Sequence, residues 1–206
     1  MMENVMTVVF KEESKTYQAL SELKNLRLSE QFTVLEAAIV KKEGGQVQFK
    51  DGFSADGAVA GKWITGGLLG SLIGILGGPL GVLLGGSIGS MIGASMAADK
   101  LSDDVGMIQA TVRQLDEGQL ALIAIVQEEN MNGLNQVLNP LDPEFMMRRD
   151  VNEVSAEVDQ AREVERELEK EARERMRSQR LEEFKDKAED IRDRVREQFD
   201  KLKQRF

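Results

Sequence analysis

The chain contains no cysteine and no histidine. Without cysteine it has no disulfide bonds, no thiolate nucleophile and no cysteine-based metal site. Without histidine it lacks the most common general base, the Ser-His and Cys-His dyads and the usual zinc ligands. We therefore expect no catalytic residues, no metal site and no bound cofactor, and we interpret the protein as a non-enzyme.

Acidic side chains offer the remaining route to a metal site. Asp103, Asp104, Asp116 and Glu117 could in principle bind Mg²⁺ or Ca²⁺. Their positions fit a helix start and a turn better, because acidic residues stabilise the positive end of a helix. We expect them to be structural.

Charge is missing from one long stretch of a chain whose net charge is −9. The 36 residues from Trp63 to Ala98 include no Asp, Glu, Lys or Arg. No concentrated basic surface is evident, so we expect no nucleic-acid partner, and no small-molecule substrate is indicated. The first residues, MMENVMTVVFKEESK, lack the features of a signal peptide. We expect the soluble parts to face the cytoplasm.

Hydrophobic patterns on both sides of the uncharged stretch predict a small α/β domain. Strands are expected over 5–11, 32–42 and 46–50, with a helix from about Ser14 whose apolar stripe is Tyr17, Leu20, Leu23 and Leu26. Beyond the stretch, a helix capped by Ser102 and ended by Gly118 leads into the central strand LALIAIV, residues 120–126. A short helix over 131–138 and an edge strand over 145–149 follow.

This order predicts an α+β fold, a ferredoxin-like split-βαβ sandwich interrupted by an insert. The expected organisation is an α/β domain formed by 1–57 and 99–150, a glycine-zipper helical hairpin over 58–98, and a long charged amphipathic helix over 151–206. The two ends of the insert must then lie close together, as those of a hairpin do.

Glycine recurs at every fourth position of the uncharged stretch. The predicted helix-packing residues are Gly66, Gly70, Gly74 and Gly78 before the Gly77-Gly78-Pro79 break, and Gly81, Gly85, Gly89 and Gly93 after it. Each set would line one helix face and let another backbone approach closely. Glycine costs a helix about 1 kcal/mol relative to alanine, so packing must offset the penalty.

Three environments could supply that packing. The hairpin could lie in lipid, since Trp63–Gly78 and Pro79–Ala98 provide 16 and 20 uncharged residues against the roughly 17 to 25 that cross a bilayer. Lys62, Trp63 and Lys100 would then be the membrane-interface residues. Alternatively, the hairpins could pack on copies of themselves, or form the buried core of a soluble domain.

The last 56 residues contain 15 basic and 17 acidic side chains around an apolar stripe. The stripe follows an 11-residue period from Phe184 to Phe206, which is typical of a straight or slightly right-handed helix packing. Backward, after a slip near Arg180, it runs through Met176, Ala172, Leu168, Val164, Ala161, Val158 and Val154. A partner helix or self-association, a lipid surface, and an exposed helix with Glu-Arg pairs are the alternatives.

Segments of the first 128 residues resemble a known family. VVFKEESKTYQALSEL, EAAIVKKEGGQVQFKD, GGLLGSLIGILGGPLGVLLGGSIGSMIGA and QLALIAIV are similar to a bacterial family of predicted membrane proteins of unknown function. The resemblance covers residues 4 to 128 and implies membrane association, without an activity, a substrate or catalytic residues. The charged helix after Val151 departs from the family pattern.

The sequence thus favours a non-enzymatic, membrane-associated protein that self-assembles through the zipper hairpin and the C-terminal helix. We expect a homo-oligomer and a lipid bilayer as its partners. A soluble homo-oligomeric shell, ring or filament, with the hairpins buried inside a cytoplasmic assembly, is the alternative. A membrane pore is a further alternative, although the hairpin offers no polar lining for an ion path.

Overall fold

The computed structural model describes residues 1–54, 67–85, 106–171 and 173–174. Its contacts divide the chain into two units, Met1–Val164 and Glu165–Phe206. The first unit contains every strand and therefore the sheet. In the second unit, residues 165–171 are helical, and Arg173 forms an ion pair with Glu169, one helical turn earlier, at 3.3 Å.

A five-stranded sheet organises the first unit, in the order β3-β2-β4-β1-β5 with every neighbouring pair antiparallel. The strands are β1 (Met2–Phe10), β2 (Phe32–Glu43), β3 (Gln46–Ser54), β4 (Leu120–Glu128) and β5 (Pro143–Asp150). The predicted α+β class is confirmed. The predicted central position of residues 120–126 and the predicted edge strand near residue 145 are also confirmed.

The strand order differs from that of a ferredoxin-like sandwich. In that sandwich the third strand of the chain lies between the first two, whereas here β4 fills that place and β3 lies at the edge. The parallel strands β1 and β2 still have one antiparallel strand between them, as in a split βαβ unit. Element order in the sequence did not distinguish these two ways of filling the gap.

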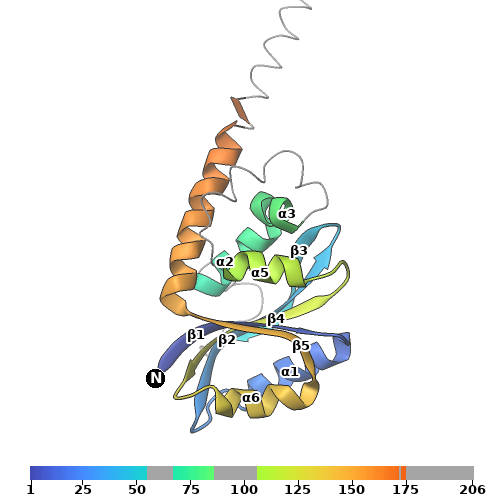
Figure 1. Cartoon of the computed structure of the whole chain (residues 1–206), viewed down its shortest axis with the longest axis vertical. Helices are drawn as coiled ribbons and strands as arrows, with labels where there is room; N and C mark the ends of the chain where they lie inside the picture. The colour runs from blue at the N-terminus through green and yellow to red at the C-terminus, as the bar shows by residue number, and fades with distance from the viewer. Residues whose placement is uncertain (55–66, 86–105, 172, 175–206) are drawn as a thin grey trace, which may run out of the picture. The chain divides into compact units, whose positions relative to one another are not determined.

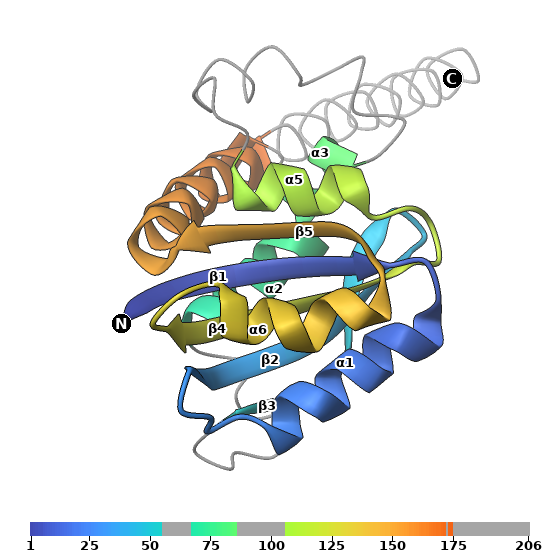
Figure 2. The same ribbon diagram turned by 60° about the horizontal axis from the view of Figure 1, so that its bottom comes forward.

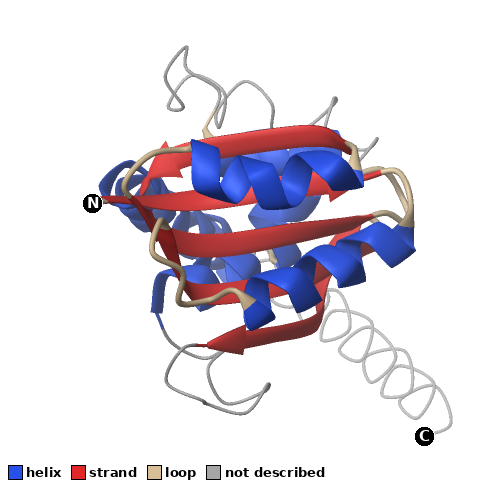
Figure 3. Ribbon diagram, turned by 90° about the horizontal axis from the view of Figure 1, so that it is seen from below, coloured by secondary structure: helices blue, strands red, loops and turns tan. Residues whose placement is uncertain are grey.

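Helices cover both faces of the sheet (Figures 1 and 2). On one face lie α1 (Glu13–Asn25), α6 (Asn132–Leu138) and the short 3-10 helix η2 (Asn139–Leu141), as Figure 3 shows from below. On the other lie α2 (Gly67–Gly77), α3 (Pro79–Gly85), α5 (Met107–Gln114) and the helical residues 151–164. Because both faces are covered, β4 is apolar on both sides and shows no polar alternation.

Alternate residues of each central strand enter two separate cores. Along β1, Val5 and Val9 face α2 and α5, while Met6, Val8 and Phe10 face α1 and α6. The larger core also takes the apolar side of α2, namely Leu69, Leu72, Ile73, Ile75 and Leu76. Within the uncharged stretch, α2 is therefore a layer that packs on the sheet of its own domain.

Two helices differ from their predictions, α1 in which of its residues are buried and α5 in where it ends. The stripe predicted for α1 leaves Tyr17 and Leu26 exposed, because nine residues turn a helix through two and a half turns and place the two on opposite sides. Leu20 and Leu23 are buried as predicted, together with Thr16 and Ala19. The start predicted at Ser102 lies outside the described residues, whereas α5 covers Met107–Gln114 and ends well before Gly118, which takes φ +84° in the turn before β4.

Candidate functional site

The predicted helix-packing glycines have different surroundings. In α2, Gly70 is buried, whereas Gly74 is exposed and has open space where a side chain would stand. Gly78 is half-buried in the break between α2 and α3, Gly81 is buried in α3, and Gly85 ends α3. Gly66, Gly89, Gly93, Lys62, Trp63 and Lys100 lie outside the described residues, and so does most of the predicted second zipper helix.

Two glycines do allow main chains to approach closely. A Cβ on Gly77 would lie 2.5 Å from the carbonyl oxygen of Val47, so the end of α2 rests directly on β3. A Cβ on Gly81 would overlap the carbonyl oxygen of Leu76, which places the first turn of α3 against the last turn of α2. Gly81 belongs to the predicted set of glycines, although its contact is with the preceding turn rather than with a second helix face, and Gly77 lies one position away from that set.

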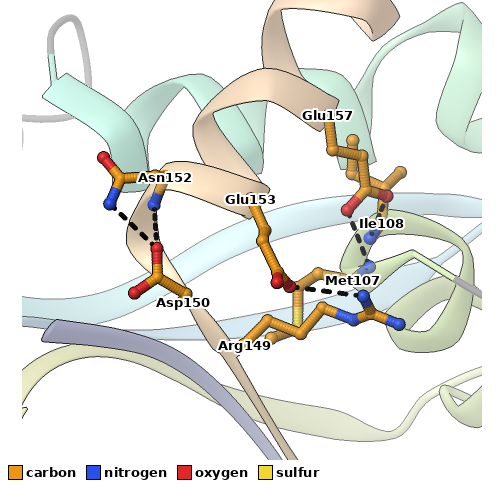
Figure 4. A network of polar contacts seen from close by, with 7 residues as sticks. All are labelled: Met107, Ile108, Arg149, Asp150, Asn152, Glu153 and Glu157. Atoms are coloured by element: carbon orange, nitrogen blue, oxygen red, sulfur yellow. Dashed lines mark hydrogen bonds and ion pairs between the residues drawn. The ribbon is translucent and has the colours of Figure 1, made fainter. Parts of the chain in front are cut away.

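The most distinctive polar arrangement joins α5 to the helix that begins at Val151. The Glu157 carboxylate accepts hydrogen bonds from the backbone N–H of Met107 at 2.7 Å and of Ile108 at 2.9 Å (Figure 4). These N–H groups belong to the first turn of α5, where no helical partner is available. We call this arrangement, formed by Glu157, Met107 and Ile108, the carboxylate latch.

Neighbouring residues fit the latch closely. Gly106 precedes the helix in extended conformation, and a Cβ there would overlap the Glu157 carboxylate. Burial raises the pKa of Glu157, while the two backbone hydrogen bonds and the positive charge of Arg149 act in the opposite direction. Arg149 itself pairs with Glu153, one turn before Glu157, at 3.4 Å. Half-buried in this way, Glu157 caps the start of α5.

The latch connects two parts of the chain that the sequence singles out. Residues 106–108 begin eight positions after the end of the glycine-rich segment 58–98, and Glu157 lies on the long amphipathic helix. Valines on both sides of Glu157, Val154 and Val158, are buried in the larger core. On the same helix, Arg162 donates a hydrogen bond to Ser71 of α2. The helix is thus fixed to the layer formed by α2 and α5.

A second buried polar cluster lies on the opposite face of the sheet. Arg148 Nε of β5 is 3.2 Å from Glu128 Oε1 of β4, across the intervening strand β1. Asn4 Nδ2 also donates to Glu128 Oε1 at 3.2 Å, and Arg148 Nη2 donates to Asn135 Oδ1 at 2.7 Å. Glu128 is fully buried, and burial lowers the pKa of Arg148, with Glu128 acting in the opposite direction. This cluster ties three strands and α6 together.

Sequence reasoning missed Glu157, Glu128 and Arg148. A signal existed for two of them: Glu157 lies beside the valine stripe of its helix, and Glu128 has the same strand parity as Val126, which is buried. Among the predicted acidic residues, Glu117 accepts hydrogen bonds from the N–H groups of Gly44 and Gly45 at the β2–β3 turn. Asp103 and Asp104 lie outside the described residues.

The described residues hold no group of three or more acidic side chains placed to bind a metal ion. Within the same residues, no helix combines the length and apolar content needed to cross a membrane. Compared with protein-family models, with curated proteins and with solved structures, the chain shows no significant match in any of the three.

Proposed function

We propose that this chain is a non-enzymatic structural protein whose copies assemble through the C-terminal helix, with the sheet domain as a rigid head. The observation that carries the proposal concerns the apolar stripe of the helix that begins at Val151, because only the start of this stripe is known to be buried in the head. At its start, Val154, Val158 and Ala161 are at most 4 % exposed and belong to the larger core. The same stripe continues in the sequence through the second unit to Phe206.

The apolar stripe beyond Val164 needs a partner that covers it from water. The sequence predicts helix over these 42 residues, and a single helix cannot bury its own apolar side. A matching helix from another copy would bury the stripe and leave the charged side chains in water. The carboxylate latch supports this role, because it fixes residues 151–164, the part of the helix that belongs to the first unit, to the head.

The proposal also includes contact with a lipid surface. Because the apolar side of α2 is buried on the sheet, we place this contact in the uncharged residues 86–98 rather than in α2. Lys100 would then be the nearest interfacial cation, and the head would face the cytoplasm. Flotation of the full chain with liposomes tests this part, and protein that stays at the bottom of the gradient would contradict it.

Substitutions along the predicted helix test the assembly directly. Val195→Asn with Phe199→Asn removes two stripe positions, whereas Glu197→Asn with Gln204→Asn changes the opposite side of the predicted helix. We expect the unmodified chain to be larger than a monomer by light scattering without detergent. The first pair should shift it toward the monomer, and the second should leave its mass unchanged. A monomeric unmodified chain would overturn the proposal.

A further inference from the structure

Exposed apolar side chains gather at one end of the sheet. Among the described residues, six large apolar side chains are exposed, and Tyr17 is the one that lies elsewhere. The other five have exposed fractions between 45 % and 75 %. They are Met1, Met2, Leu26, Leu28 and Met131, which we call the sheet-end patch.

Strand register places these residues together. Met2 of β1 and Phe32 of β2 both pair with Glu128, so the starts of β1 and β2 meet the end of β4. Loop residues 26–31 lead into β2, and residues 129–131 follow β4. The N–H of Glu129 donates to the carbonyl of Gln31 at 3.3 Å, which joins the two loops into one surface (Figure 3).

The loop that carries Leu26 and Leu28 is held in place. Ser29 Oγ accepts the N–H of Phe32 at 3.0 Å, and the N–H of Val34 donates to the carbonyl of Arg27 at 2.8 Å. Leu28 also forms a β-bridge with Thr33, yet it is 74 % exposed. These contacts fix the loop with its leucines toward solvent, which is costly for a surface that stays free.

Charges of both signs border the patch. Lys24 and Arg27 lie at the end of α1 and in the α1–β2 loop, which also carries Glu30, and Glu129 follows β4. None of these four forms an ion pair within the described part of the chain. The α1–β2 side thus has two basic side chains and one acidic side chain, and the β4 side has one acidic side chain, so a second copy turned by a two-fold rotation can pair a basic residue with an acidic one.

We propose that the sheet-end patch is an isologous contact between two copies of this chain, in which the apolar residues meet and Arg27 of each copy faces Glu129 of the other. A second copy satisfies both signs of charge, whereas an anionic lipid surface would repel Glu30 and Glu129. This inference rests on the proposed self-assembly and adds a second contact to it. Head-to-head contacts and helix contacts together would link copies into larger assemblies.

Analytical ultracentrifugation of the full chain tests the contact. Leu28→Ser with Met131→Ser should raise the dissociation constant of the head contact by about tenfold or more, because both side chains lie in the apolar centre. Tyr17→Ser is the matched control, since Tyr17 is exposed away from the patch, and it should leave association unchanged. All substituted residues are exposed, and thermal melting of each variant verifies that the head stays folded.

Charge reversal distinguishes a second copy from other partners. Arg27→Glu and Glu129→Arg should each weaken association, and the chain with both changes should recover it. Failure of the double variant to recover would overturn the isologous contact, as would loss of liposome flotation without any change in protein association.

The helix variant Val195→Asn with Phe199→Asn separates this inference from the proposed function. If it abolishes all association and the patch variants change nothing, the helix proposal stands and the patch inference fails. If it changes nothing while the patch variants dissociate the protein, the patch inference stands and the helix proposal fails.

Discussion

The Glu157 carboxylate lies 2.7 Å from the backbone nitrogen of Met107, although 50 residues separate them in the chain. Removing this contact should loosen the helix at its base. Glu157→Ala leaves two N–H groups of α5 without an acceptor and should cost about 1–3 kcal/mol of folding free energy. Denaturant unfolding measures the loss, and faster hydrogen exchange at Met107 and Ile108 would locate it. The exposed neighbour Glu153→Ala should cost much less.

The pH dependence of the latch follows from the raised pKa of Glu157. A carboxyl group whose pKa is higher in the folded state binds more protons there than in the unfolded chain. Its stabilising contribution is therefore complete below the ordinary value of 4.5 and is lost as pH rises through the raised pKa. Relative to Glu157→Gln, the unmodified protein should gain thermal stability as pH falls from 7 toward 4.5. A difference in melting temperature between the two proteins that stays constant over this pH range would contradict the raised pKa of Glu157.

Two glycines of α2 should respond in opposite directions to the same substitution. Gly77→Ala forces a methyl group against the Val47 carbonyl and should destabilise the domain by about 1–3 kcal/mol. Gly74→Ala meets open space and should stabilise it by about 0.5–1 kcal/mol through helix propensity. Chemical denaturation of the two variants measures both effects. Equal effects would show that α2 does not rest on β3.

The buried pair of Glu128 and Arg148 should be sensitive to the loss of one partner. Arg148→Met leaves the Glu128 charge buried without its cation and should cost about 3–5 kcal/mol. Replacing both residues, by Glu128→Leu with Arg148→Met, should cost less than the sum of the single changes. The solvent-screened pair of Lys50 and Glu43 provides the control, because Lys50→Met should cost much less than Arg148→Met. Additive costs at the buried pair would contradict the coupling.

The sequence predicts the local elements of this fold better than their arrangement. Apolar runs bounded by turn residues locate β1, β2 and β4, and the prolines at 140 and 143 mark the end of α6. It does not predict that β4 rather than β3 fills the gap between β1 and β2, since that choice depends on contacts far apart in the chain. Nor does it predict the start of α5, where Glu157 provides the cap from 50 residues away.

The glycine pattern shows the same difference between local structure, which the sequence predicts, and the arrangement of elements, which it does not. Its spacing predicts glycine-lined helix faces that pack together, whereas the close approach at Gly81 is to Leu76, five residues earlier at the α2–α3 turn. The partner of the approach at Gly77 is a strand of the same domain, which no spacing within the helix can indicate. Likewise, α2 contains no charged residue, yet its side chains cover the sheet. Composition describes how apolar a surface is but not what covers it.

The most direct test of the self-assembly account is the molar mass of the full chain in detergent-free buffer, measured by light scattering across a concentration series. The account predicts a mass of at least twice the 22.9 kDa of one chain, reduced by Val195→Asn with Phe199→Asn and unchanged by Glu197→Asn with Gln204→Asn. A mass of one chain at every concentration, identical for all three proteins, would contradict it.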